Sequence, residues 1–316
     1  MDHVRWLDQP TLRRPMLIAA FTGWNDAGDA ASNGVRHLVE TWNAKPLAEL
    51  DPEEFTDFAT VRPHVRLRPD RSRHIVWPTV GLWYASTPGG DVILMLGPEP
   101  ALRWRMFTEQ ITGIAARFDV SLVLTLGALL ADVPHTRPVQ IIGTSTEQGL
   151  IDRFDLQRSR YEGPTGIVGV LQDACTQADI PSASLWAAVP AYASQVPSPK
   201  AALALVTKAC DMLGSPAPIA RLEHEADEYD ARVDTLVADD SDLGGYVSRL
   251  ESMSDDGELD EFDDGDYDED DAMFDDDADD VDDENPAATS LSERDVNSDD
   301  LMAEVEQFLR DQGTDK

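Results

Sequence analysis

The chain of 316 residues contains 61 acidic and 25 basic residues, which gives a formal net charge of −36. Most of this charge lies at one end, because residues 251–316 hold 29 acids and 3 bases, whereas residues 1–250 hold 32 acids and 22 bases. Without a basic stripe to neutralise phosphates, nucleic acid is not an expected partner. No apolar run reaches the length of a membrane span, and the N-terminal residues lack the apolar stretch of a secretory signal, so no membrane contact and a cytoplasmic location are expected.

Five short apolar runs, bounded by glycine, proline or polar residues, predict strands that are buried on both faces of a sheet. These runs cover residues 16–21, 91–96, 120–126, 139–142 and 183–189. Apolar residues spaced three and four apart predict helices over residues 31–42, 104–118, 167–178 and 202–213. The alternation of strand and helix predicts an α/β fold whose mostly parallel sheet has helices on both sides.

Residues 51–90 interrupt this alternation. They are extended and rich in β-formers, and they are punctuated by Pro63, Pro69, Pro78 and Pro88. Because proline is tolerated at the edges of sheets, this stretch predicts a hairpin or an extension of the sheet.

A long helix is predicted at about residues 216–238. Its apolar residues recur three and four apart, which is typical of a helix that packs on another helix. The surface that it packs on is either this chain's own domain or a second copy of the chain.

The sequence thus predicts a domain over residues 1–250, an acidic linker over 251–296 and a short helix over 297–312. Between Asp255 and Glu284, 20 of 30 residues are acidic and none is basic, which predicts disorder. Ser298 can cap the amphipathic helix, which we expect to dock on the domain or on a partner protein. The candidate docking residues are Leu301, Met302, Val305, Phe308 and Leu309.

The sequence contains two cysteines, Cys175 and Cys210, on the apolar faces of predicted helices. Reduced, packed thiols are expected in preference to a disulfide or a reactive site.

Loops that follow the predicted strands are where an open α/β sheet binds ligands. The first loop holds Asn25, Asp26 and Asp29 around Gly23 and Gly28. Its glycine spacing is that of a phosphate-binding Walker loop, but Asp29 stands where lysine is required, which excludes a triphosphate bound in that way. Either these side chains line a pocket, or Asn25 or Asp26 caps the next helix in a tight turn.

Later loops supply the other candidate pocket residues. Glu99 precedes a predicted helix and is either an acid–base group or a carboxylate that the helix dipole favours. Asp132, His135 and Arg137 could position an anion or transfer a proton, or they could hydrogen-bond to one another in a rigid turn. Tyr192 follows the fifth strand and either lines the same pocket or packs.

Three other motifs fail the templates that they resemble. The hydroxyls around Ser145 lack the Gly-x-Ser-x-Gly frame of a nucleophile elbow. His224 lacks the second histidine of a zinc metalloprotease pair, because Glu228 stands there. An acidic stretch with calcium-loop spacing has Asp271 in place of the required glycine. No catalytic residue, metal or cofactor is therefore assigned.

Five blocks of sequence occur in order within about residues 12–215. They are LIAAFTGWNDAGDAAS, GPEPALRWRMF, LGALLADVPHTRPV, SRYEGPTGIVGVL and PAYASQVPSPKAALAL. Together they resemble the bacterial branch of the proteasome assembly chaperone 2 family. The resemblance implies a three-layer α/β/α fold with a mixed sheet, similar to phosphorylases and peptidyl hydrolases.

The resemblance also implies a function. Relatives in eukaryotes and archaea are chaperones that guide assembly of the proteasome core particle, commonly as oligomers. Many of them end in a hydrophobic-Tyr-any-residue tail, whereas this chain ends Gly313-Thr314-Asp315-Lys316. We therefore expect a non-catalytic protein-binding or assembly factor that forms a homo-oligomer and binds a protein partner, proteasome-related or not.

The alternative is an enzyme or small-molecule binder with a phosphorylase-like or hydrolase-like pocket at the strand ends. That reading requires the eight candidate side chains to converge in one cleft.

Overall fold

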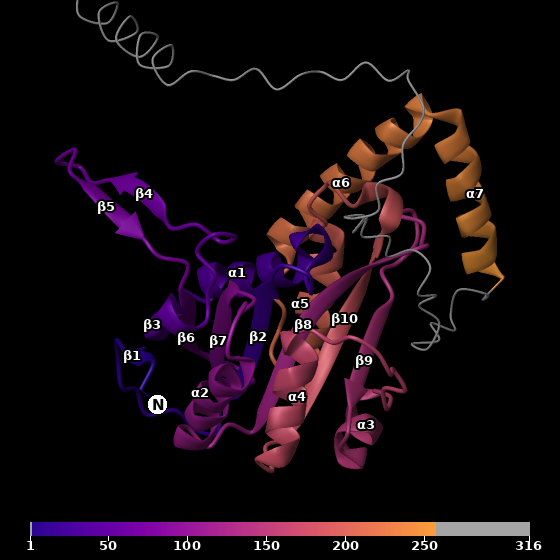
Figure 1. Cartoon of the computed structure of the whole chain (residues 1–316). Helices are drawn as coiled ribbons and strands as arrows, with labels where there is room; N and C mark the ends of the chain where they lie inside the picture. The colour runs from indigo at the N-terminus through magenta and orange to yellow at the C-terminus, as the bar shows by residue number, and fades with distance from the viewer. Residues whose placement is uncertain (1, 257–316) are drawn as a thin grey trace, which may run out of the picture. The chain divides into compact units, whose positions relative to one another are not determined.

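The computed structural model describes residues 2–256 (Figure 1). Most of the predicted acidic linker and all of the predicted helix at 297–312, with its docking residues, lie outside the described residues. Within residues 2–256, no helix is long and apolar enough to cross a membrane.

Eight strands form one mixed sheet in the order β1-β3-β6-β7-β2-β8-β10-β9. Their bounds are β1 Val4–Trp6, β2 Met16–Thr22, β3 Lys45–Leu50, β6 Val80–Thr87, β7 Gly90–Pro98, β8 Leu122–Ala131, β9 Ile141–Ser145 and β10 Ser182–Pro190. All five strands predicted from apolar runs are present, and β1, β3 and β6 extend the sheet beyond them.

The sheet is parallel only at its centre, where β7, β2, β8 and β10 lie side by side. The four other strand pairs are antiparallel. The sheet is thus mixed, as the family resemblance implies, and the expectation that it is mostly parallel is wrong. For the pair β6 and β7 the antiparallel direction follows from the connection. A tight turn between Thr87 and Gly90 joins these strands, and strands joined in that way run antiparallel.

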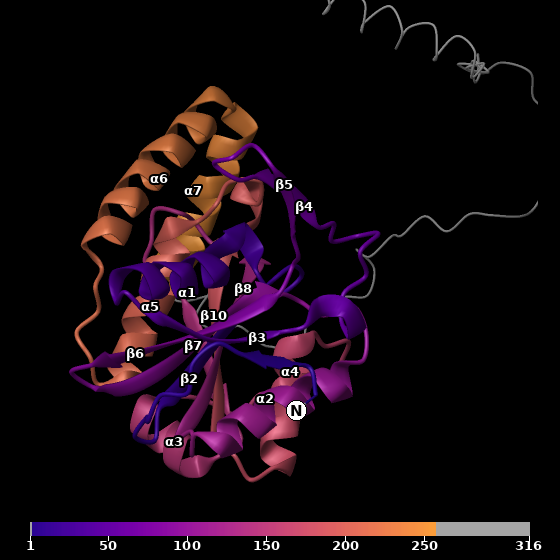
Figure 2. The ribbon, with the colours of Figure 1, turned by 90° about the vertical axis from the view of Figure 1, so that its left-hand side faces the viewer.

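Helices cover both faces of the sheet, as Figure 2 shows. On one face α1 (Ala30–Thr41) and α5 (Pro199–Leu213) pack on side chains that include Ile18 and Ala20. On the other face α2 (Trp104–Arg117) and α4 (Ile167–Gln177) pack on Leu17, Ala19 and Phe21. Alternate residues of β2 therefore enter opposite cores, which explains why the whole strand is apolar.

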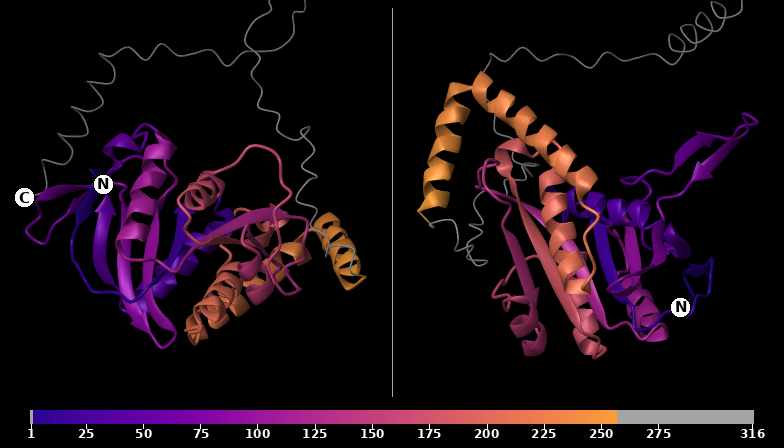
Figure 3. Two further views of the ribbon diagram at one scale, coloured as in Figure 1. Left: turned by 90° about the horizontal axis from the view of Figure 1, so that it is seen from below. Right: turned by 180° about the vertical axis from the view of Figure 1, so that it is seen from behind.

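The remaining helices are shorter or lie at the C-terminal side. They are α3 Gln148–Phe154, α6 Ala220–Asp239, α7 Ser241–Asp255 and the 3-10 helices η1 Ala27–Asp29, η2 Pro52–Glu54 and η3 Ala191–Ala193. The predicted long helix corresponds to α6, which packs on α5 of its own domain. The sequence did not predict α7, which follows α6 closely (Figure 3) and extends beyond residue 250.

Strands β4 (His64–Leu67) and β5 (Arg73–Val76) pair only with each other and form a separate two-stranded sheet. This hairpin lies in the segment for which the sequence predicted a hairpin or a sheet extension, and the segment contains both. We call residues 61–78 the arm, because they project from the domain (Figures 1 and 3). At its base the rings of Phe58 and Trp77 meet edge to face, with centroids 5.1 Å apart.

Candidate functional site

The loops after β2, β7, β8 and β10 leave the same edge of the sheet, since these four strands are parallel. All eight candidate side chains belong to these loops, but the structure divides them. Asn25, Asp26 and Glu99 take part in one set of contacts, and a second set involves Asp132, His135, Arg137 and Tyr192. The eight side chains therefore do not form one set of contacts.

In the first set, Glu99 joins two loops to a helix. Its Oε1 accepts a hydrogen bond of 2.8 Å from Asn25 Nδ2 and another of 2.8 Å from the backbone N–H of Ile167, at the start of α4. A Cβ on Gly166 would lie 2.2 Å from Asn25 Oδ1, so only glycine fits there. A carboxylate at a helix N-terminus is favourable without any chemistry, and Glu99 uses one oxygen for this purpose.

Asp26 caps α1 across the one-turn helix η1. Its Oδ1 accepts hydrogen bonds from the backbone N–H groups of Ala31 at 2.8 Å and Ser32 at 3.1 Å. Burial raises the pKa of the Asp26 carboxyl, because desolvation disfavours its charged form. Asp29 has a left-handed backbone and makes no side-chain cap. The first loop is thus the capped strand-to-helix turn that the sequence offered as one alternative.

In the second set, the buried ring of His135 lies between two partners. Tyr192 Oη is 2.8 Å from His135 Nδ1, and it also accepts a hydrogen bond from the backbone N–H of His135. Asp234 Oδ1, on α6, is 3.0 Å from His135 Nε2. Because a carboxylate oxygen only accepts hydrogen bonds, His135 Nε2 donates to Asp234. Burial raises the pKa of Tyr192 to about 12, so the hydroxyl remains protonated.

The rest of this loop is held by α7. Asp132 accepts a hydrogen bond of 2.6 Å from Tyr246 Oη, and Thr136 donates one of 2.6 Å to Glu251. Arg137 makes a bidentate pair with Asp255, at 2.8 and 2.7 Å. Sequence reasoning expected Asp132, His135 and Arg137 to bond to one another or to a ligand. Over residues 2–256 they bond to α6, α7 and Tyr192 instead, because the C-terminal helices fold back over the loop.

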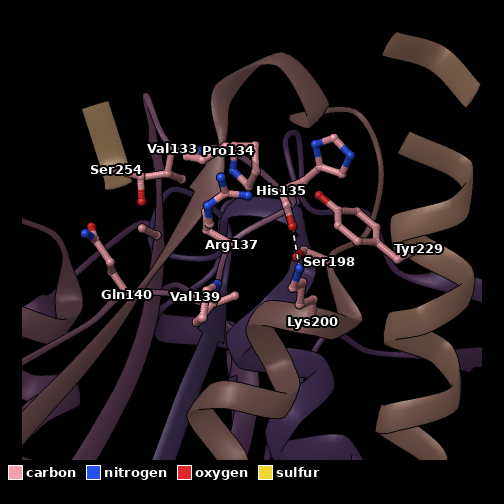
Figure 4. A pocket seen from close by; sticks show the side chains of 13 residues that line it. Val133, Pro134, His135, Arg137, Val139, Gln140, Ser198, Lys200, Tyr229 and Ser254 are labelled. Atoms are coloured by element: carbon pink, nitrogen blue, oxygen red, sulfur yellow. Dashed lines mark hydrogen bonds between the residues drawn. The ribbon is translucent and has the colours of Figure 1, made fainter. Parts of the chain in front are cut away.

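A small hollow that is partly open to solvent lies beside this loop (Figure 4). Of the eight candidates only His135 and Arg137 line it, together with Lys200, Tyr229 and Ser254 of α5, α6 and α7. Its two cations are already paired, Arg137 with Asp255 and Lys200 with Asp230 at 2.8 Å. The described residues contain no cluster of three or more His, Cys, Asp or Glu able to hold a metal.

The hydroxyl side chains of Thr144 and Ser145, which lack the frame of a nucleophile elbow, are part of strand β9. Because β9 runs antiparallel to β10, its end lies at the opposite edge from the other loops. Thr144 hydrogen-bonds to Ser184 at 2.7 Å, and Ser145 to the carbonyl of Ser182 at 2.8 Å. These hydroxyl groups hydrogen-bond β9 to β10, and they do not belong to the loops that follow β2, β7, β8 and β10.

The partners that sequence reasoning missed are Asp234, Tyr246, Glu251 and Asp255. Asp234 lies on α6, where the sequence does not distinguish it from the other exposed acidic residues of that helix. The other three lie on α7, where the adjacent Gly244 and Gly245 mask the helical pattern. No signal in the sequence pairs them with a loop more than 90 residues earlier.

The comparison with family models decides the classification. Residues 20–237 match the model described as PAC2 family. The chain belongs to the PAC2 family. The comparison with curated proteins gave no match.

Solved structures of PAC2 relatives resemble the chain. A PAC2 family protein from Streptomyces avermitilis is 44% identical with a TM-score of 0.69, over 74% of this chain and 99% of that one. A proteasome-assembly chaperone homologue of Mycobacterium tuberculosis is 43% identical with a TM-score of 0.67, over 73% and 99%. An archaeal proteasome activator from Pyrococcus furiosus, 17% identical with a TM-score of 0.60 over 74% and 97%, shares the fold.

Proposed function

We propose that this PAC2 protein is a non-catalytic factor that binds other polypeptides and assists their assembly, and that the proteasome core particle is the first partner to test. The observation that carries the proposal is its 43% identity, over almost the whole length of the relative, to a protein described as a proteasome-assembly chaperone homologue.

The strand-end geometry supports the same proposal. Glu99 and Asp26 bond to helix N-termini, while His135 and Arg137 are held by acids of α6 and α7. A catalytic site would need side chains that converge on one space and remain available to a substrate. These four side chains instead fix loops to helices, which favours a scaffold for protein contacts.

The decisive experiment is reconstitution. Proteasome α and β subunits from the same organism are prepared separately and mixed with or without the full chain. Core-particle formation is followed by native electrophoresis and by peptidase activity. We expect faster assembly, or a stable complex of the chain with one subunit. Unchanged assembly together with no complex would refute the proteasome as partner.

The predicted docking face at residues 301–309 supplies a variant for this assay. In the triple variant Leu301→Asp, Val305→Asp and Phe308→Asp, the predicted apolar face becomes charged. If that face docks on the subunits, the variant loses the effect on assembly. The homo-oligomer remains part of the proposal and is measured by sedimentation of the same samples.

A further inference from the structure

The arm has two chemically different faces. Register pairs Val65 with Ile75 and Leu67 with Arg73 in one layer of side chains, and Arg66 with His74 in the other. Because side chains alternate along a strand, Val65, Leu67 and Ile75 share one face and Arg66 and His74 share the opposite one. One face of the arm is therefore mostly apolar, with Arg73 beside Leu67, and the opposite face is mostly polar, with His64, Arg66 and His74 beside Val76. We call the first the apolar face.

The apolar face is uncovered within the described residues. Val65 is 54% exposed, Leu67 is 68% exposed and Ile75 is 48% exposed. A two-stranded hairpin is marginally stable alone in water, and exposed apolar strands invite pairing with another chain. An apolar face of this kind is typical of a surface that a polypeptide covers.

The arm is also the basic part of an acidic protein. Residues 61–78 contain five arginines and one aspartate, whereas the rest of residues 1–256 contains 17 bases and 34 acids. The most complementary segment is in the same chain, since residues 257–284 contain 18 acids and no base. Beyond it, at residues 301–309, lies the predicted apolar face with acids at Glu304 and Glu306.

We propose that the arm is the docking site for this chain's own C-terminal segment, residues 257–316. The acidic stretch pairs with the arginines, and the apolar residues at 301–309 cover Val65, Leu67 and Ile75. Length permits this contact, because 28 residues can span about 90 Å and a domain of this size has a radius of gyration of about 18 Å.

Two other occupants fit the observations less well. A nucleic acid would match the arginines but would leave the apolar face uncovered, and the net charge of −36 would repel its phosphates. A second copy would have to compete with a tail that is tethered to the same chain, for which the effective concentration is in the millimolar range.

The test uses the full chain with one dye on the arm and one on the tail. Val61→Cys and Ser290→Cys provide the labelling sites. The native thiols of Cys175 and Cys210 are buried, and burial raises their pKa to about 12 and about 11, which keeps them unreactive. Energy transfer within single chains at low concentration reports docking. We expect high transfer in low salt and a loss of transfer as salt rises.

Matched charge reversals locate the contact. Arg66→Glu, Arg68→Glu and Arg73→Glu on the arm should abolish transfer. Arg105→Glu, Arg153→Glu and Arg232→Glu change the charge equally on exposed positions of α2, α3 and α6 and should preserve it. A third variant, Leu67→Asp with Ile75→Asp, should weaken transfer through loss of the apolar contact. Circular dichroism establishes that each variant is folded.

Three outcomes overturn the proposal. Equal transfer in the arm and control variants would show that the arm is not the site. Transfer only between singly labelled chains in a mixture would assign the arm to a second copy. Absence of transfer, with binding of a short labelled nucleic-acid duplex that the arm variant abolishes, would assign it to nucleic acid. None of these outcomes depends on a proteasome partner.

Discussion

The Glu99 carboxylate holds three segments together at one point of the fold. It accepts hydrogen bonds from Asn25, in the loop after β2, and from Ile167, at the start of α4, while Glu99 itself follows β7. Asn25 is 1% exposed, and its Nδ2 group donates to the Glu99 carboxylate away from water, whereas its Oδ1 has no hydrogen-bond partner among the described residues. The absence of a side chain at Gly166 permits this approach.

Replacement of Gly166 by alanine should break this contact. The backbone at Gly166 is extended and suits alanine, but the new Cβ would lie 2.2 Å from Asn25 Oδ1 and 3.0 Å from Glu99 Oε1. We expect a loss of about 1–3 kcal/mol in the free energy of unfolding, measured by denaturant titration. The matched control is Gly149→Ala, where no atom lies within 4 Å of the new Cβ. An equal loss in both variants would contradict the steric explanation.

Asp26 predicts a pH dependence. Its pKa in the folded state is raised by burial, so the carboxyl stabilises the fold most below its ordinary pKa of 3.8, and this stability is lost as the pH rises through the folded-state pKa. In Asp26→Asn the amide oxygen can keep the cap but does not titrate. The stability of the wild type relative to Asp26→Asn should therefore fall as the pH rises from about 4 to 8.

Asp26→Ala serves as the comparison for the cap itself. It removes the acceptor for the N–H groups of Ala31 and Ser32. The free energy of unfolding of Asp26→Ala should therefore be about 0.5–2 kcal/mol lower than that of Asp26→Asn at the same pH. Thermal unfolding over the same pH series measures both effects. A pH-independent difference between the wild type and Asp26→Asn would rule out burial as the dominant influence on this carboxyl.

At the scale of elements, α7 fastens the loop after β8. The Asp240 carboxylate caps the first turn of α7 by accepting hydrogen bonds from the N–H groups of Asp242 and Leu243. The buried residues of α7 are Val247 and Leu250. With such a small apolar face, the polar contacts to residues 132–137 decide how firmly α7 is held.

Arg137→Ala should loosen α7 selectively. Hydrogen exchange of the α7 amides should accelerate while α6 and the sheet stay protected, and high salt should reduce the difference from the wild type. Arg232→Ala, at an exposed position of α6, is the control. The hydrogen bond and charge of Arg137 lower the pKa of Asp255, so this contribution is present above the ordinary pKa of 3.8 and is lost as the pH falls below it. As the pH falls through the lowered folded-state pKa of Asp255, the two proteins should come to exchange alike.

The sequence predicted the central elements and missed the peripheral ones for physical reasons. Buried strands such as β2 are apolar throughout, and helices such as α1 have one apolar stripe, so both are visible in a single segment. The direction of β9 and the position of α7 depend on contacts between distant segments. The capping role of Asp26 was among the sequence alternatives, because it is local. The Glu99 contact with Ile167 was not, because 68 residues separate them.

At the scale of the whole molecule, charge is segregated along the chain. The arm carries a net charge of +4, with five arginines and one aspartate, and the segment from Asp255 to Glu284 has 20 acids and no base. The strands β4 and β5 contribute no residue to the two large hydrophobic cores. The arm is therefore attached to the domain without being needed for its cores, which indicates a role in contacts.

Replacement of residues 62–76 by a short Gly-Ser linker should leave the domain folded. The edge-to-face contact of Phe58 with Trp77 is retained, and the cores lose no residue, so the midpoint of thermal unfolding should stay within about 4 °C of the wild type, the shift that about 1 kcal/mol produces in a domain of this size. The same variant should lose any contact made through the arm, which sedimentation and the reconstitution assay measure on one sample. Loss of cooperative unfolding would instead make the arm a structural part of the domain.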